Sequence, residues 1–352
     1  MRIPWIEGER EEGPALRAAL LPMAALSWVY GGGARLHRAL YDRGLRRQTR
    51  LGCRVLSVGN LGVGGAGKTP TTATLARELR RRGHRVAIAS RGYRRDVREP
   101  VVVVSDGRRV LARAAESGDE PLLLAAHAPG VPVLVGARRA AVGQRAIASF
   151  GAEVLILDDG FQHHALERDL DLVVLDGHFG LGNARLLPRG PLREPLSALR
   201  RAHALGVIDG PLSEADERRV ARFAAGARRF EARRAPRGLR PLEGGDLEDL
   251  TGLAGQEVGL LSGIARPDSL RRSVTALGAC VVAERRFRDH HRYRPADLEG
   301  LSRAAPCWVT TEKDAIKLNP AWAGSARVHS LVIELEFDAP DFVDWLSTRL
   351  RG

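Results

Sequence analysis

A glycine-rich segment between an apolar run and an amphipathic stretch constrains the fold of this chain more than any other feature. Its pattern, G-x-x-x-x-G-K-[ST], is formed by Gly62, Gly67, Lys68 and Thr69. Residues 55–58 before it are mostly apolar with β-branched side chains, which indicates a buried strand, and residues 71–82 have the apolar spacing of a helix. The segment is therefore predicted to be a phosphate-binding loop between a strand and a helix.

The chemistry of such a loop follows from its backbone. Glycines allow N–H groups to turn inward around phosphate oxygens, and the N-terminus of the helix adds a partial positive charge. Lys68 is expected to reach the β- and γ-phosphates, and the Thr69 hydroxyl to bind Mg²⁺. The rest of the predicted nucleotide-binding loop is Gly62, Gly64, Gly65, Ala66 and Gly67. The alternative is a glycine-rich turn, but with only three Lys in 352 residues a chance match to this pattern is rare.

A second apolar run ends in two carboxylates. Residues 154–157 are Val-Leu-Ile-Leu, and Asp158 and Asp159 follow them directly. An aspartate at the carboxyl end of a strand holds Mg²⁺, directly or through water, in many phosphate-loop proteins. Strand ends of an open α/β sheet face the ligand crevice. The alternative is a strand followed by an Asp-Gly turn, but together with the phosphate loop we predict a metal role for both aspartates.

Beyond the loop, strand-like and helix-like segments alternate along the chain. Strands are predicted at 86–90, 101–104, 133–135, 154–157, 172–175 and 205–208, with a helix over 138–150 among them. This alternation predicts a phosphate-loop-type, doubly wound and mostly parallel α/β sheet. Arginine-rich sequence over 218–240 then interrupts the pattern, and a second, smaller α/β unit follows it. Three parts are predicted: an N-terminal segment 1–50, a core 51–228 and a C-terminal domain 229–352.

Charge and cysteine content narrow the class of partner and compartment. The net charge of +13 and the pI near 10.8 indicate an acidic partner, which is a nucleotide, a nucleic acid or an anionic membrane surface. Nearly all the positive charge is Arg, so a surviving Lys marks a place where a compact ammonium is required. The three Cys are far apart and form no CxxC pair, which favours a reducing cytosol over a disulfide framework or a zinc ribbon.

The N-terminal segment has the composition of a membrane-interface helix. Residues 15–30 are apolar but short and interrupted by Arg17 and Pro22, so they are not predicted to span a bilayer. Acidic residues at 7–12 precede the run, which argues against a signal peptide. Several arginines follow Trp28 and Tyr30, as expected for a helix lying on an anionic surface. The alternative is an ordinary helix packed on the domain.

Two further motifs carry polar side chains whose purpose is less evident. Asp119 lies in Ser-Gly-Asp-Glu-Pro, and His290 lies in Asp-His-His. A carboxylate can accept the proton of an alcohol during phosphoryl transfer, and a neighbouring His can orient that carboxylate. Spacing alone cannot pair Asp119 with His290, and from the residues alone each is expected to be a turn or surface position. Adjacent His side chains point apart, so a metal site at His163–His164 or at His290–His291 is not expected.

Taken together, the motifs resemble those of the tetraacyldisaccharide 4'-kinases, the lipid A kinases of Gram-negative bacteria. The matching blocks run in order along the chain at 58–70, 90–93, 118–121, 157–163, 182–183, 186–194, 263–264, 289–291 and 310–318. Two departures lie near the expected acceptor side: Arg189 replaces a small residue, and 261–265 reads Leu-Ser-Gly-Ile-Ala. Neither touches the phosphate loop.

The resemblance implies ATP-dependent phosphorylation of the 4'-hydroxyl of the lipid A disaccharide 1-phosphate. The enzyme would be peripheral at the cytoplasmic face of the bacterial inner membrane, with the C-terminal domain closing over the site. Asp119 would be the base and His290 its partner, while Lys68 would neutralise phosphate charge. The implied Mg²⁺ ligands are Thr69, Asp158, Asp159 and, less directly, Glu194. Weaker expectations for substrate contact are Tyr93, Arg139 and Gln162.

Two rival functions remain at this stage. A nucleic-acid-dependent ATPase would suit the charge, but aromatics make up only 5% of the chain and no strand interleaves aromatic with basic residues. We therefore expect no nucleic-acid partner. A membrane-bound nucleotide switch is the other rival. Lys313 and Asp314 are adjacent, so the guanine-recognising pattern Asn-Lys-x-Asp is absent there and ATP is preferred to GTP. No obligate protein partner is inferred.

Overall fold

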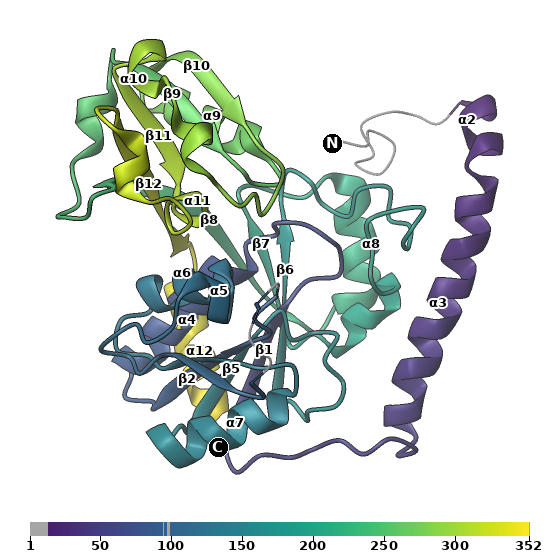
Figure 1. The fold of residues 1–352 in the computed structure, drawn as a ribbon. Coiled ribbons are helices and arrows are strands. Elements are labelled where there is room, and N and C mark those ends of the chain that lie inside the picture. Colours follow the sequence, from purple (N-terminus) through teal and green to yellow (C-terminus); the bar gives the residue numbers. More distant parts are fainter. Residues whose placement is uncertain (1–12, 94, 97–98, 352) are drawn as a thin grey trace.

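A single mixed sheet of twelve strands runs through the computed structural model, which describes residues 13–93, 95–96 and 99–351. The strand order is β10-β9-β11-β12-β8-β7-β6-β1-β5-β2-β4-β3 (Figure 1). Only the pairs β8–β12 and β3–β4 are antiparallel among the strand pairs described. The prediction of a doubly wound, mostly parallel α/β sheet is confirmed.

The first half of the sheet is parallel except for its edge strand. Its strands are β1 (Arg54–Gly59), β2 (Val86–Ser90), β3 (Val102–Ser105), β4 (Val133–Val135), β5 (Val154–Asp158), β6 (Leu170–Asp176) and β7 (Ala204–Ile208). Most of these residues are buried, because helices cover both faces. Parallel strands buried on both faces are continuous apolar runs, which is why their positions were predictable to within about two residues.

Helices pack on the two faces of this half according to the alternation of side chains along β1. Leu56 and Val58 point to the face covered by α4 (Lys68–Arg81), α6 (Asp119–His127) and α12 (Pro340–Arg351). Val55 points to the face covered by α7 (Arg139–Phe150). Farther along the sheet, α8 (Glu214–Ala224) covers β6 and β7. The helix α5 (Ala114–Ser117) leads into α6.

The second half of the sheet is joined to the first by a long antiparallel pair, β8 (Arg228–Pro241) and β12 (Arg327–Phe337). Beyond this pair lie β9 (Glu257–Ser262), β10 (Cys280–Arg286) and β11 (Cys307–Thr311). The helices of this half are α9 (Pro267–Ala276), α10 (Leu301–Ala304) and α11 (Glu312–Ala315). It has its own core around the buried Trp308. We call the part that holds β9, β10 and β11 the C-terminal lobe, and the part that holds β1 to β7 the N-terminal lobe.

The arginine-rich stretch 218–240 is regular helix and strand, so the alternation of elements continues through it, and its strand lies where the two halves of the sheet join. It forms the second half of α8 and nearly all of β8, with most of its arginines toward solvent and apolar residues such as Val220 and Phe230 buried. The predicted division at residue 228 coincides with the start of β8. The last helix, α12, nevertheless returns to the N-terminal lobe, where Phe342 stacks on Phe230 with ring centroids 4.1 Å apart.

The N-terminal helices lie along the side of the molecule. They are α2 (Pro14–Ala19) and the long α3 (Leu21–Asp42), which extends beside the N-terminal lobe in Figure 1. The Ser27 hydroxyl donates to the Leu186 carbonyl at 2.9 Å and accepts the Arg189 N–H at 3.0 Å, which fixes α3 to the loop after β6. Among the described residues, no helix combines the length and apolarity needed to cross a bilayer. Residues 1–12 of the predicted N-terminal segment, with their acidic side chains, lie outside the described residues.

Short 3₁₀ helices complete the chain. They are η1 (Leu196–Arg201), η2 (Leu250–Leu253), η3 (Pro295–Leu298) and η4 (Pro320–Ala323). The first of them follows the loop that contacts α3, and η3 follows the segment that carries His290. Both therefore end segments that contribute to the site described next.

Candidate active site

The predicted phosphate loop connects the end of β1 to the start of α4 at Lys68. Gly64 and Gly67 have φ of +113° and +83°, a region that L-residues with a side chain rarely adopt. The loop is held by backbone contacts from the segment after β6, since the Val63 N–H donates to the Pro191 carbonyl at 2.8 Å. Gly67 precedes the first helical residue, so the free N–H groups of the first turn of α4 border the loop.

Lys68 folds back over this loop. Its Nζ donates to Asn60 Oδ1 at 3.3 Å and to the Gly64 carbonyl at 3.5 Å, and it lies 3.6 Å from Asp159 Oδ1. The ammonium is thus held between the loop and the strand-end carboxylates. That position suits a cation that binds phosphate oxygens lying in the loop.

The two aspartates at the end of β5 lie beside the loop because β5 pairs in parallel with β1. Asp158 is buried and accepts the Thr72 hydroxyl at 3.3 Å. Burial raises the pKa of Asp158 to about 7; the charges of Glu120 and Asp159 act in the same sense, while Lys68 and Thr72 oppose them. The mutual repulsion of two adjacent carboxylates therefore adds to burial in keeping the proton on Asp158.

Asp159 is in a different electrostatic setting, although it is the next residue. Its backbone has φ of +54°, and its Oδ2 accepts Arg193 Nη1 at 2.9 Å. Burial opposes ionisation of this carboxyl, but Lys68 and Arg193 hold its pKa below the usual range. Asp159 is therefore the ionised member of the pair.

The residues present fit a magnesium ion. Mg²⁺ binds through one or two carboxylates together with substrate phosphates and retained waters, so a dedicated protein cage is not needed. No cluster of three or more His, Cys, Asp or Glu able to hold a metal occurs in the part of the chain that is described. The buried Asp159 Oδ1 accepts no hydrogen bond from the described residues, and a bound cation would favour the ionised form of Asp158. Thr69, Asp158 and Asp159 would hold such an ion.

Asp119 and His290 come together from opposite lobes. Asp119 is the first residue of α6, and His290 lies in the loop after β10, 171 residues away. His290 Nδ1 lies 3.0 Å from Asp119 Oδ2. His290 has φ of +60°, so this loop turns the imidazole toward α6 with an unusual backbone conformation. The structure brings together the two residues that spacing could not pair.

The charges around this pair favour an ionised carboxylate. Burial alone would raise the pKa of Asp119, but the His290 hydrogen bond and the charges of Lys313 and Lys317 bring it below its ordinary value. Glu120, the next residue on α6, lies 3.9 Å from Lys313 and also acts on the ionisation of Asp158. The Asp119–His290 pair and the phosphate-loop carboxylates therefore form one electrostatic site.

A cavity of about 570 Å³ opens between the two lobes beside this site. Its lining includes Thr69 from α4, Leu123 from α6, Lys313 from α11 and Arg266 from the loop before α9. This size is within the range of pockets that bind nucleotide-sized ligands. The cavity places the end of the phosphate loop and the C-terminal lobe around one space.

The remaining predicted site residues have varied surroundings. Glu194 makes a bidentate ion pair with Arg201, at 3.0 Å from Oε2 and 3.1 Å from Oε1, so its carboxylate already has a cation. Gln162 Nε2 donates to the Asn60 carbonyl at 2.9 Å beside the phosphate loop. Arg139 is buried, which lowers its pKa to about 10, although Asp158 and Asp159 oppose this. The exposed Tyr93 ring lies 6.1 Å from the His290 ring.

Two arginines at the site were not singled out from the sequence. Arg193 pairs with Asp159, as described above. Arg266 of the C-terminal lobe contacts Asp176 at 3.0 Å, stacks over Phe179 and approaches Gly64 of the phosphate loop. Arg is abundant throughout this chain, so composition marked neither residue, although Arg193 lies within the matching block 186–194.

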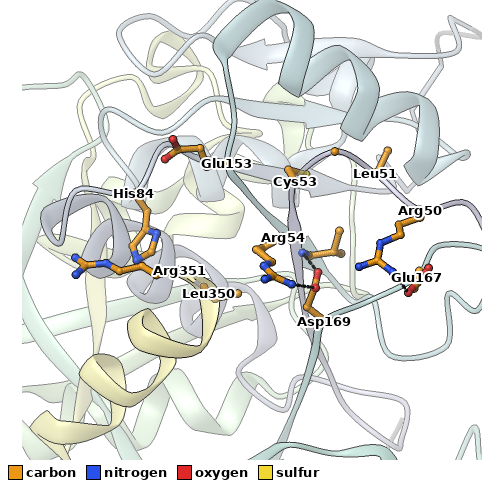
Figure 2. A pocket seen from close by; sticks show the side chains of 12 residues that line it. Arg50, Leu51, Cys53, Arg54, His84, Glu153, Glu167, Asp169, Leu350 and Arg351 are labelled. Carbon is orange, nitrogen blue, oxygen red and sulfur yellow. Dashed lines mark hydrogen bonds and ion pairs between the residues drawn. The ribbon is translucent and has the colours of Figure 1, made fainter.

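A second cavity of about 570 Å³ lies at the opposite, amino-terminal ends of the parallel strands, where β1 begins (Figure 2). Two of its arginines are paired with carboxylates: Arg54 with Asp169 at 2.8 Å, and Arg50 with Glu167 at 3.3 Å. Asp169 Oδ2 also accepts the Val55 N–H at 2.7 Å. None of the predicted site residues lines this cavity, so it is not a candidate active site.

Comparison with known proteins places the chain in a family. The family description "Tetraacyldisaccharide-1-P 4'-kinase" matches residues 17–351. A relative from Anaeromyxobacter sp. (strain Fw109-5), named tetraacyldisaccharide 4'-kinase, is 46% identical over 350 residues, which cover 95% of this chain and 91% of the relative. The chain belongs to the tetraacyldisaccharide 4'-kinase family.

Other relatives agree with this assignment. A tetraacyldisaccharide 4'-kinase from Syntrophus aciditrophicus (strain SB) is 44% identical, covering 88% of each chain. The crystal structure of "apo" form LpxK from Aquifex aeolicus in complex with ATP has a TM-score of 0.76 and 33% identity, and covers 96% of this chain and 98% of that one. The resemblance seen in the sequence is confirmed, and with it the prediction of an enzyme of the kinase class. In that structure the Aquifex aeolicus protein is bound to ATP.

Proposed function

We propose that this kinase transfers the γ-phosphoryl group of ATP to the 4'-hydroxyl of the tetraacyldisaccharide 1-phosphate precursor of lipid A. The observation that carries the proposal is the 3.0 Å contact between Asp119 and His290, made across the two lobes beside the phosphate loop. A transfer site needs a phosphate cradle and a proton acceptor facing the same space. The family description and the relatives' names supply the identity of the acceptor.

In the proposed reaction Asp119 accepts the proton of the sugar hydroxyl. The hydroxyl oxygen forms a bond to the γ-phosphorus, the bond to the β-phosphate oxygen breaks, and ADP leaves. The lowered pKa of Asp119 keeps the carboxylate ionised near neutral pH, which is the form able to accept the proton. His290 orients the carboxylate through its Nδ1 contact. The cavity between the lobes excludes water when the acceptor fills it.

The negative charge on the transferred phosphoryl group would be offset by cations of the chain itself. Lys68 already lies over the loop where the β- and γ-phosphates would bind. Arg193 lies nearby, because it donates to Asp159, which Lys68 also approaches. Preorganised charges of this kind stabilise charge that develops in the transition state. Mg²⁺, when held by Thr69, Asp158 and Asp159, would neutralise further charge on the phosphate oxygens. Glu194 remains a weaker metal candidate, and Tyr93, Arg139 and Gln162 remain candidates for substrate contact.

The direct test is a phosphoryl-transfer assay with labelled ATP and the tetraacyldisaccharide 1-phosphate, followed by thin-layer separation of the lipid. We expect label in the lipid with the wild-type chain and very little with Asp119→Asn. Nucleotide binding by Asp119→Asn, measured by calorimetry, is expected to stay near that of the wild type, because Asp119 is not part of the phosphate loop. ATP hydrolysis with no labelled lipid would reject the proposal in favour of an ATPase or a nucleotide switch.

We further propose that α3 lies on the anionic cytoplasmic surface of the inner membrane. Trp28 is 80% exposed, Val29 74% and Leu21 65%, although all three are apolar. Exposed apolar residues next to basic ones are typical of helices that lie in a membrane interface. Arginines at 35, 38, 43, 46 and 47 follow along α3 and the turn after it. The Ser27 contacts hold the opposite side of α3 against the loop that carries Arg193.

Sedimentation with liposomes of mixed anionic and neutral lipid tests this surface. Replacing both Trp28 and Val29 with Ser is expected to reduce binding strongly, and high salt is expected to release part of the wild-type protein by screening the arginines. The matched control is Val282→Ser, which removes an exposed apolar side chain of β10. Equal binding by the double variant and the control would reject α3 as the membrane contact.

A further inference from the structure

Lys313 contacts the ring nitrogen of His290 that is turned away from Asp119. Its Nζ lies 3.2 Å from His290 Nε2, while His290 Nδ1 lies 3.0 Å from Asp119 Oδ2. The imidazole is therefore placed between an ammonium and a carboxylate. Lys313 belongs to α11, which begins directly after β11, so the three residues come from three separate segments. Lys313 is one of only three lysines in the chain.

The chemistry of the three groups determines where the imidazole proton lies. A lysine ammonium has three donors and no acceptor, so it can only donate to a ring nitrogen. His290 Nε2 must then present its lone pair, which leaves the single N–H on Nδ1. That N–H points at Asp119 Oδ2, a carboxylate oxygen able to accept it. A doubly protonated ring would place an N–H against the ammonium and would repel it.

The other charged groups around the ring agree with this arrangement. Asp289, the neighbouring residue, has its Oδ2 at 3.9 Å from His290 Nε2, which is beyond hydrogen-bond distance. Its Oδ1 instead accepts Lys313 Nζ at 3.2 Å. Glu120 of α6 lies 3.9 Å from Lys313 on the side of the N-terminal lobe. Lys313 is thus held by two carboxylates and by the imidazole, and its side chain is largely buried.

We propose that Lys313 is a positioning residue that donates to Nε2 of His290 and so holds the ring in the neutral form with its proton on Nδ1. This proposal rests on the proposed function of the Asp119–His290 pair. Its consequence is that Asp119 receives a neutral hydrogen bond and keeps its charge for the acceptor hydroxyl. The proton taken from the hydroxyl then stays on Asp119 until release, because Nδ1 already carries a proton and Nε2 is occupied by Lys313.

Nuclear magnetic resonance of the full chain labelled with ¹⁵N-histidine tests the tautomer directly. The His290 signals are assigned by their loss in His290→Gln. At neutral pH we expect a neutral ring protonated at Nδ1 in the wild type, and a change to the Nε2–H tautomer or the imidazolium in Lys313→Met. Lys313→Arg retains a donor at this position and is expected to preserve the wild-type tautomer. Arg303→Met, which removes an exposed cation of α10, is the charge-matched control.

Kinetics separate positioning from binding. Lys313→Met is expected to lower kcat by roughly 10- to 100-fold, by analogy with the loss of a group that orients a metal-bound His, with little change in KM for ATP. Lys313→Arg is expected to recover most of this loss, and Arg303→Met to show none. An imidazolium or an Nε2–H ring in the wild type would overturn the proposal. So would an unchanged tautomer in Lys313→Met, even with a lower kcat, since Lys313 would then act by another route.

Failure of this proposal is distinguishable from failure of the proposed function. If His290→Gln and Asp119→Asn leave lipid phosphorylation intact, the catalytic pair is wrong whatever tautomer is observed. If both variants lose activity while the wild-type ring is not the Nδ1–H form, only the role of Lys313 is wrong. Because the wild-type spectrum alone can contradict the proposal, it remains testable even if Lys313→Met does not fold.

Discussion

The two ends of the parallel strands carry cavities of equal volume, but the charged groups beside them are arranged differently. At the start of β1, in the cavity of Figure 2, Arg54 has Asp169 and Arg50 has Glu167 as partners. At the other end of the same strand, carboxylates are crowded and share their cations. Burial raises the pKa of Asp158 to about 7, with help from Glu120 and Asp159, while Lys68 opposes the shift.

The difference teaches where this fold binds charged ligands. Helices of a parallel α/β sheet begin at the carboxyl ends of the strands, so free N–H groups and partial positive charge gather at that edge. Carboxylates placed there can hold a cation that a phosphate group brings with it. Arg50 and Arg54 in the cavity of Figure 2 already have carboxylate partners, so they do not need a ligand to balance their charge. Equal volume therefore does not mean equal function.

At the carboxyl ends of the strands, the largest loss of activity is expected when the proton acceptor is removed. Asp119→Asn is expected to lower kcat about 10²- to 10⁴-fold, the range for removing a general base. His290→Ala is expected to lower kcat as well, but the double variant should lose less than the product of the two losses, because residues that act as a unit are not additive. Steady-state kinetics of the three variants measures this. Fully multiplicative losses would show that Asp119 and His290 act separately.

The next effect concerns the phosphate loop. Lys68→Ala is expected to lower turnover about 10²- to 10³-fold, as when one preorganised transition-state partner is removed. The measurement is lipid phosphorylation at saturating ATP, with circular dichroism to show that the chain is folded. Near-normal turnover by a folded variant would mean that the phosphate loop at the carboxyl end of β1 does not bind the transferred phosphate.

Replacing Asp158 is expected to increase the stability of the fold, whereas the two replacements above are expected to reduce activity. Because the pKa of this carboxyl is raised from 3.8 to about 7, the folded protein without metal keeps a proton that the unfolded chain releases. Its stability therefore falls as pH rises from about 4 to 7, and the loss is complete above that range. Asp158→Asn removes the charge and is expected to stabilise the metal-free protein at pH 8 by about 2–4 kcal/mol. Thermal unfolding of both proteins with a chelator checks this, and a less stable variant would contradict it.

The pH dependence of catalysis sharpens the comparison further. The pKa of Asp119 is lowered by His290 and by Lys313 and Lys317, against the effect of burial. Activity should therefore persist down to a pH below the ordinary range for Asp and fall only as the carboxylate becomes protonated. In His290→Ala the burial effect remains while the main opposing contact is lost, so the acidic limb of kcat/KM should move to higher pH. A limb that stays in place would mean that another group controls it.

The smallest effect is expected in the cavity of Figure 2. Arg50→Gln removes one partner of an ion pair in which both side chains are largely exposed. Such pairs contribute about 0.2–1 kcal/mol to stability, so unfolding should change by no more than this and kcat should not change. Chemical denaturation and the lipid assay give the two numbers. A large loss of activity would show that the two edges are coupled.

Local features of the fold were predictable because each depends on a few residues that are close together in the sequence. The strand before the phosphate loop, Gly67 and the aspartates at the end of β5 were all recognised from neighbours in sequence. The helix and strand within 218–240 were not recognised, because the many arginines obscured the buried positions of β8, such as Phe230. Arg193 and Arg266 were missed for a related reason: Arg is so common in this chain that a single Arg attracts no attention, even at Arg193 within the matching block 186–194.

The sequence by itself determined the phosphate loop, the strand-end aspartates and the family, because each depends on residue types at fixed short spacings. Only the tertiary structure decided which charges meet. Asp119, His290 and Lys313 come from three segments, and their contacts at 3.0 and 3.2 Å depend on how β8 and β12 set the C-terminal lobe against α6. Hydrogen bonds and ion pairs act over a few ångströms in space. Distance along the chain carries no information about them.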